Sequence, residues 1–220
     1  TYIQNEERWK AYVRDSIIEP SISRDIIQLE RISKPALLHQ LFALACTYSG
    51  RILSYQKMLG QLQDVGNATT LAHYLKLLGE AGLVVGIEKH YEEVVRVKAS
   101  SPKLAVCNTA LMTAMLPYEF NEIRSRHELW GHLFESAIGA RLIPDCHKNG
   151  IQLHYWNAGN KEVDYILKKG DKLAAIEVKS VSADSVSGIK EFRTKHTHAK
   201  PYLIGGQGMS QELFFSSNIS

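Results

Sequence analysis

The sequence has few cysteines, no long hydrophobic run and no secretory signal segment. Its three cysteines, Cys46, Cys107 and Cys146, are odd in number and far apart, which argues against a disulfide framework and a cysteine zinc site. The most apolar segment, residues 36–46, is interrupted by two polar residues and is shorter than the roughly 20 residues that span a membrane. These absences predict a cytoplasmic protein with reduced thiols and no membrane partner.

An excess of charge of one sign is also missing. The 26 Lys and Arg against 23 Asp and Glu give a net charge of +3, which by itself is too small to indicate a polyanionic partner. No Gly-x4-Gly-Lys-Ser/Thr loop occurs, so we expect ATP to be bound only by a module upstream of this chain. The chain begins at Thr1 rather than at methionine, and further residues are therefore expected before it. The glycine-rich residues 205–208 lack the P-loop lysine and are typical of a turn.

The strongest chemical pattern lies in residues 154–180. Apolar and β-branched runs separated by clusters of turn-forming residues predict three consecutive strands there. Three charged residues, Asp164, Glu177 and Lys179, interrupt these runs, although a charge inside a strand is costly unless it is solvated, paired or bound to a metal. Glu177 and Lys179 are two residues apart and so share one face of their strand. Asp164, on the neighbouring strand, is expected to reach the same face.

The spacing Asp-x12-Glu-x-Lys resembles the active-site signature of the PD-(D/E)XK nuclease fold. The flanking patterns agree with its order of helix, three strands, helix and strand. A helical pattern covers residues 123–143, a polar helix is expected over 184–195, and a closing strand over 201–204. The first of these helices carries Glu135, where the resemblance implies a further acid.

The resemblance implies a catalytic set of Glu135, Asp164, Glu177 and Lys179. Its three carboxylates, with the Val178 carbonyl as a further ligand, would hold Mg²⁺ or Mn²⁺, which prefer oxygen ligands. Lys179 would orient the attacking water or stabilise developing negative charge. Two other interpretations stay open: an ion-pair network at a solvated sheet edge, and a nuclease-like fold that has lost catalysis and only binds.

Two further polar side chains, Glu128 and His132, share the helical face of Glu135. They are possible accessories to the site, although a solvated helix face explains both.

The first hundred residues predict a different kind of unit. Residues 1–35 are predicted to form a helical linker whose first helix ends, or has a joint, at Pro20.

Within residues 36–100, three helices are expected: 36–48, one that Ser54 caps, and 68–81, which Asn67 caps. Two strands, over 82–87 and 94–97, should follow. This order resembles a winged helix with residues 89–91 at the tip of its wing. Together with a nuclease-like domain over 101–220, it predicts an α+β or α/β fold.

The third helix of this unit would be its DNA-reading helix. It offers Thr69, Thr70, His73 and Lys76, and the wing adds Lys89. Residues 1–100 contain 12 Lys and Arg against 11 Asp and Glu, however, and a DNA-reading module normally has a clear basic excess. A role in packing against protein therefore remains the favoured alternative to DNA binding.

Several segments along the whole chain resemble the C-terminal portion of a bacterial and archaeal family of AAA-type ATPases. The matching pieces are residues 12–15, 69–75 with 80–83, 103–108, 131–135 and 155–179. Asn108 departs from the aspartate expected there. The resemblance implies an upstream ATPase module as partner and a metal-dependent nuclease-like domain that acts on nucleic acid. The alternative is a non-catalytic module that binds DNA or protein through a degenerate nuclease fold.

Overall fold

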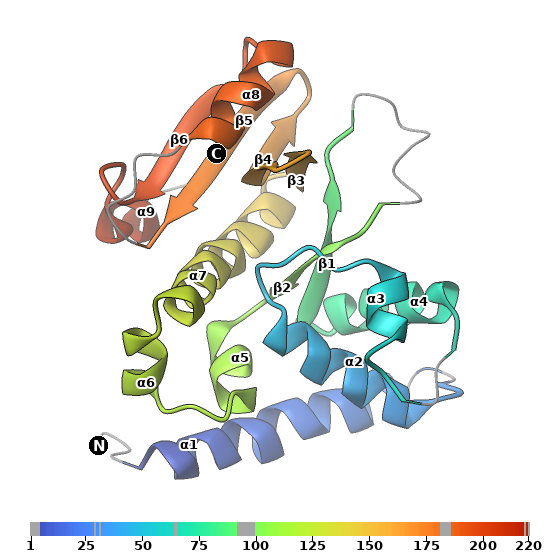
Figure 1. The fold of residues 1–220 in the computed structure, drawn as a ribbon. Coiled ribbons are helices and arrows are strands. Elements are labelled where there is room, and N and C mark those ends of the chain that lie inside the picture. The colour runs from blue at the N-terminus through green and yellow to red at the C-terminus, as the bar shows by residue number, and fades with distance from the viewer. Residues whose placement is uncertain are drawn as a thin grey trace.

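A computed structural model describes residues 5–28, 30, 32–63, 66–91, 100–180, 186–217 and 219. Within these residues the fold is mixed α+β with a six-stranded sheet in the order β2-β1-β3-β4-β5-β6 (Figure 1). Neighbouring strands are antiparallel except β1 with β3 and β5 with β6. The strands are β1 Val84–Lys89, β2 Lys103–Val106, β3 Gln152–Ala158, β4 Lys161–Lys169, β5 Lys172–Lys179 and β6 Lys200–Gly205.

The predicted helices are present, with differences at their ends, but the one expected over 123–143 is broken at Arg126 and the short helix over 211–216 was not predicted. Ser54 and Asn67 are confirmed as caps, because each side chain accepts a hydrogen bond from the backbone N–H three residues later. The described helices are α1 Glu6–Val13, α2 Pro35–Thr47, α3 Tyr55–Leu59, α4 Ala68–Glu80, α5 Thr109–Met115, α6 Phe120–Ser125, α7 His127–Lys148, α8 Ser187–Lys195 and α9 Gln211–Ser216. None of them is both long enough and apolar enough to cross a membrane.

Two prolines do not end their helices. Pro20 has helical backbone angles and lies between two π-helical segments, Arg14–Ile18 and Ser21–Ile26, so the prediction that a helix ends there is wrong, although two segments do meet at this proline. The i→i+5 bonding of a π-helix differs from the i→i+4 pattern that a proline disrupts. Pro144 likewise lies inside α7, which extends beyond the predicted end at residue 143.

The predicted wing differs from the observed structure where the two can be compared. Its second strand, over 94–97, lies outside the described residues. The antiparallel partner of β1 within the described part is β2, from beyond the domain boundary predicted at residue 100. His90, expected at an exposed tip, is buried beside Phe192. Its backbone N–H donates to the Tyr155 carbonyl oxygen at 2.7 Å. The winged-helix arrangement and the domain boundary stay predictions.

Three hydrophobic clusters form the core. The largest joins the N-terminal helices, and Figure 1 shows α7 running from this helical part to the sheet. On one face of the sheet, Ile138 of α7 packs in a cluster with Tyr165 and Ile176. On the other face, Phe192 of α8 packs in a cluster with Val163. Helices therefore pack on both faces of β4 and β5, the strands that carry the predicted site.

Candidate functional site

Asp164 lies at a β-bulge on β4. Val163 pairs with Trp156 and Ile166 with His154, which leaves Asp164 and Tyr165 together opposite a single residue of β3. Such a bulge changes the direction of the side chains that follow it, and bulges are frequent beside active sites. Asp164 Oδ2 accepts a hydrogen bond from the Val178 N–H of β5 at 2.7 Å. Because Tyr165 pairs with Ile176, continuing the register by one residue sets Asp164 opposite Glu177.

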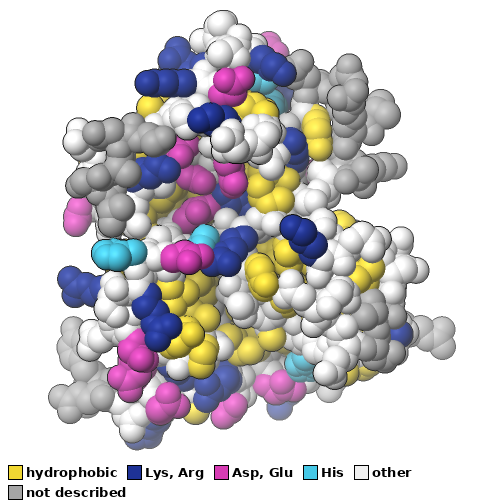
Figure 2. Space-filling model, viewed as in Figure 1, with side chains coloured by type: hydrophobic (Ala, Val, Ile, Leu, Met, Phe, Trp, Pro, Cys, Tyr) yellow, Lys and Arg dark blue, Asp and Glu magenta, His cyan; other side chains and the backbone are white. Residues whose placement is uncertain are grey.

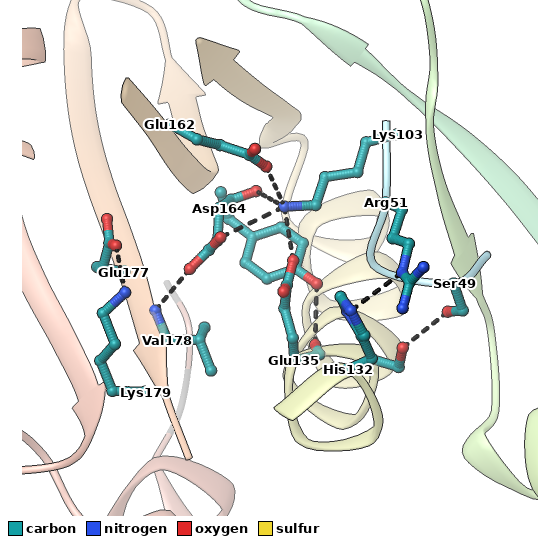
Figure 3. Close-up of polar contacts among 12 residues, drawn as sticks. Ser49, Arg51, Lys103, His132, Glu135, Glu162, Asp164, Glu177, Val178 and Lys179 are labelled. Carbon is teal, nitrogen blue, oxygen red and sulfur yellow. Dashed lines mark hydrogen bonds and ion pairs between the residues drawn. The ribbon is translucent and has the colours of Figure 1, made fainter. Parts of the chain in front are cut away.

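A buried lysine of β2 lies among the carboxylates (Figure 3). Lys103 is 1% exposed, and its Nζ lies 2.6 Å from Glu135 Oε1, 2.9 Å from Glu162 Oε1 and 3.4 Å from Asp164 Oδ1. Burial lowers the pKa of Lys103, but the three carboxylates raise it and leave it well above its usual value. Lys103 therefore carries a positive charge at neutral pH. One cation thus joins β2, α7 and β4.

Packing holds α7 against this cluster. The Tyr165 hydroxyl donates to the backbone carbonyl of Glu135 at 2.9 Å. A Cβ at Gly139 would lie 2.5 Å from that hydroxyl oxygen, so the close approach of α7 to β4 requires a glycine there. Ser136 also contacts Ser49, whose hydroxyl oxygen accepts the Val106 N–H of β2. These contacts fix Glu135 relative to β2 and β4.

Glu177 and Lys179 form a second ion pair, on β5. Lys179 Nζ lies 2.7 Å from Glu177 Oε1, and Glu177 is only 7% exposed. Its other oxygen, Oε2, is buried and has no hydrogen-bond partner among the described residues. Burial, and then the charge of Asp164, raise the pKa of Glu177. The carboxyl group therefore lacks a favourable contact that a further cation would supply.

The cluster as a whole is short of positive charge. Burial raises the pKa of Glu135 to about 8, although the Lys103 ammonium opposes the shift. If all were ionised, the four carboxylates of this cluster (Glu135, Glu162, Asp164 and Glu177) would exceed its two ammonium groups by two charges. Acidic side chains also gather in the middle of the face shown in Figure 2, bordered by lysine and arginine side chains.

These residues fit a metal only in part. Among the described residues no group of three or more His, Cys, Asp or Glu side chains is arranged to hold an ion. Glu135, the third predicted ligand, contacts Lys103. Asp164 and Glu177 remain, and Mg²⁺ is commonly bound by one or two carboxylates with water completing its shell. The buried, partnerless Oε2 of Glu177 is the observation that fits such an ion.

The two predicted accessories belong to another network. Arg51 Nε donates to His132 Nε2 at 3.0 Å, and Arg51 also pairs with the exposed Glu128 at 2.9 Å. Burial, followed by the charge of Arg51, lowers the pKa of His132. Figure 3 shows Arg51 and His132 beside the carboxylate cluster, and no ion pair joins Arg51 to its carboxylates among the described contacts.

The predicted DNA-contacting residues are divided between two elements. On α4, Thr69, His73 and Lys76 are exposed, while the Thr70 hydroxyl donates to the capping Asn67. Lys89 instead ends β1, where its ammonium lies 5.3 Å from the centre of the Tyr91 ring. Whether these residues contact DNA stays a prediction.

Sequence reasoning missed Lys103 and Glu162. Lys103 begins a short apolar run that reads as an ordinary strand, and Glu162 follows a cluster of turn formers. The one available signal was Glu162-Val-Asp164, two acids on one strand.

A groove lined by the described residues lies away from this cluster. It has a volume of about 820 Å³ and is bordered by Leu142, Ile176, Ile204 and Phe214. None of the predicted site residues lines it.

Comparison with known proteins matches two families. Residues 2–122 match the model of the domain of unknown function DUF8612, and residues 130–215 match that of the domain of unknown function DUF4143. DUF4143 is often found at the C-termini of AAA-ATPase-like proteins. No curated protein matches the chain.

Among solved structures, the chain is similar to protein VC1899 from Vibrio cholerae, with 16% identity and a TM-score of 0.26. The match covers 94% of this chain and 46% of that one, so the chain spans less than half the length of the solved protein.

Proposed function

We propose that this chain, which belongs to the family of the domain of unknown function DUF8612, hydrolyses phosphodiester bonds of nucleic acid with Mg²⁺ or Mn²⁺. Asp164 and Glu177 would hold the ion, and Lys179 would act on the phosphate. The observation that carries the proposal is the buried Oε2 of Glu177, which has no hydrogen-bond partner among the described residues, on a carboxyl group whose Oε1 pairs with Lys179. We further propose that an upstream ATPase module works with this site, since DUF4143 is often C-terminal in AAA-ATPase-like proteins.

Each charged side chain has a separate task in this proposal. Val178 holds Asp164 by its N–H, and Lys103 holds Glu135 and Glu162, so the carboxylates are oriented before substrate arrives. When bound, the ion would polarise the scissile phosphate and lower the pKa of a coordinated water. Lys179 is only partly buried and is aimed by Glu177. Its ammonium can therefore stabilise the negative charge that develops on the phosphate.

Cleavage of labelled single-stranded DNA, duplex DNA and RNA with Mg²⁺ or Mn²⁺ tests the proposal. Asp164→Asn, Glu177→Gln and Lys179→Ala should each lower the rate by about 100-fold or more, the loss typical when a group that stabilises transition-state charge is removed. Glu128→Gln, on an exposed side chain of the same helix as Glu135, should keep the parent rate. Cleavage that is the same in the parent and in all three site variants would refute the assignment.

A non-catalytic module that binds DNA or protein is the second candidate. It is favoured by Lys103, which already supplies a cation to three of the carboxylates. In this case the helices α2 to α4 and strand β1 would act as the winged helix, with the exposed face of α4 toward DNA. Anisotropy of labelled duplex DNA over a salt series distinguishes the roles. We expect weak binding, because charge in residues 1–100 is nearly balanced. Tight, sequence-selective binding with a steep salt slope would favour the winged helix.

A further inference from the structure

A small groove lies between α8 and the edge strand β6. Its volume is about 280 Å³. Its walls combine apolar side chains, two cations and one tyrosine: Val186, Ile189, Pro201, Leu203, Lys190, Arg193 and Tyr202. Tyr202 is 41% exposed, so its ring is open to a ligand. Neither Lys190 nor Arg193 has an acidic partner within the part of the chain that the structure describes.

The groove lies in the segment that carries the net charge of the whole protein. Residues 187–200 contain four Lys and Arg against one glutamate, a net charge of +3, which equals the net charge of the entire chain. The other residues are therefore electrically balanced. A basic segment on an otherwise neutral protein is the usual footprint of phosphate binding.

The groove also adjoins the carboxylate cluster. Leu203, in its wall, pairs with Glu177 across β5 and β6. Tyr202 pairs with Ile176 and borders both this groove and the groove of about 820 Å³, so it lies at the edge of the sheet between the two. At the other side, Gly188 in the first turn of α8 packs directly on the backbone of Glu162, where a Cβ would overlap the carbonyl oxygen. A ligand in the groove would thus lie one strand away from Glu177.

We propose that this groove binds a single strand of nucleic acid and leads it to the Glu177 site. Lys190 and Arg193 contact its phosphates, and Tyr202 provides the surface on which a base stacks. Cations beside an exposed aromatic ring are the combination that recognises single strands, because unpaired bases have free faces. In a duplex those faces are already stacked. This proposal specifies the substrate of the hydrolysis proposed above, and its claim about the substrate depends on that hydrolysis.

Binding is measured by anisotropy of a fluorescein-labelled oligothymidylate of about 15 nucleotides, a length that spans the site of one small binding domain. EDTA is present, so that cleavage cannot interfere. Lys190→Glu with Arg193→Glu should weaken binding at least 10-fold and reduce the salt slope, because phosphate contacts are lost. Tyr202→Ala should weaken it about 5- to 100-fold with the salt slope unchanged, because stacking is lost and phosphate contacts are not. Lys57→Glu with Arg24→Glu changes the net charge by the same amount at two exposed cations that do not line the groove, and this matched control should bind like the parent.

Three results would overturn the groove assignment. The first is groove variants that bind as the parent does. The second is duplex DNA that binds as tightly as the single strand. The third is polyglutamate that competes equally while Tyr202→Ala has no effect, which would identify a site for acidic peptides.

Binding measured in EDTA, together with cleavage measured separately with Mn²⁺, separates this assignment from the proposed hydrolysis. The double variant Asp164→Asn with Glu177→Gln should bind the oligonucleotide like the parent but not cleave it. Tight binding by a parent that never cleaves would refute the hydrolysis and leave the groove standing. Cleavage by a parent whose groove variants bind normally would refute the groove.

Discussion

The two halves of the carboxylate cluster are neutralised in different ways. In the inner half, Glu135 and Glu162 surround Lys103, which is almost completely buried. In the outer half, Glu177 pairs with Lys179, whose side chain is 26% exposed, and one of the Glu177 oxygens is buried with no hydrogen-bond partner among the described residues. Asp164 lies between the halves, with one oxygen near Lys103 and the other on the Val178 N–H.

This difference assigns different roles to chemically similar groups. The inner half connects three elements through one cation that no solvent reaches, so it stabilises the fold. The outer half has a cation that is partly exposed to solvent and a carboxylate oxygen that can accept another ligand. Stability should therefore depend on the inner half, and chemistry on the outer half.

The largest expected effect separates the two lysines. Lys103→Met leaves three carboxylates without their cation and should lower the free energy of unfolding by about 3–5 kcal/mol, the usual cost of breaking a buried pair. Lys179→Met should cost less than half as much, because Glu177 already has a raised pKa and can take up a proton. Urea unfolding of both variants measures the difference.

The control for this pair is the double variant Lys103→Met with Glu135→Gln. Above pH 8, where Glu135 is ionised in the folded parent, the double variant should regain part of the loss, because one of the unpaired charges is removed. Equal losses in the two single variants would erase the distinction between the halves.

The second effect concerns pH and the inner half. An unfolded chain releases the Glu135 proton near pH 4.5, whereas the folded chain releases it near pH 8. Between these values the folded state binds more protons, so this group contributes stability at low pH that is lost as the pH rises. We compare the free energy of unfolding of the parent with that of Glu135→Gln. The value for the parent minus the value for the variant should fall by on the order of 1–2 kcal/mol from about pH 6 to about pH 8. The histidines are the same in both proteins, so their contribution to the pH dependence cancels in this difference. A difference independent of pH would show that Lys103 keeps Glu135 ionised throughout.

The smallest effect is expected at Arg51. Its pair with Glu128 is short but exposed, and such pairs contribute about 1 kcal/mol or less. Arg51→Gln should therefore change the free energy of unfolding by less than that amount, although the pair lies beside the carboxylate cluster. A loss comparable to that of Lys103→Met would mean that Arg51 also holds the carboxylates in place. The same urea titration compares them.

Charged residues within apolar runs were enough to predict part of this site. They placed Asp164, Glu177 and Lys179 on adjacent strands, and the structure has them on β4 and β5. The bulge at Asp164 was not predictable, because it depends on how β3 pairs with β4. Lys103 was missed for a related reason. Its strand is short and reads as a local element, and only its pairing with β1 and the position of α7 bring the ammonium to the acids.

Thermal unfolding with and without millimolar Mn²⁺ tests the central claim most directly. Binding to the native state raises stability with occupancy, by about 2.7 kcal/mol at 100 times the dissociation constant. The parent should therefore melt a few degrees higher with Mn²⁺, at about 2–4 °C per kcal/mol for a chain of this size. Asp164→Ala and Glu177→Ala should show no shift, whereas Glu128→Gln and Lys179→Ala should keep it. The same Mn²⁺ shift in the parent, Asp164→Ala and Glu177→Ala would contradict the account, because the outer half would then bind no metal.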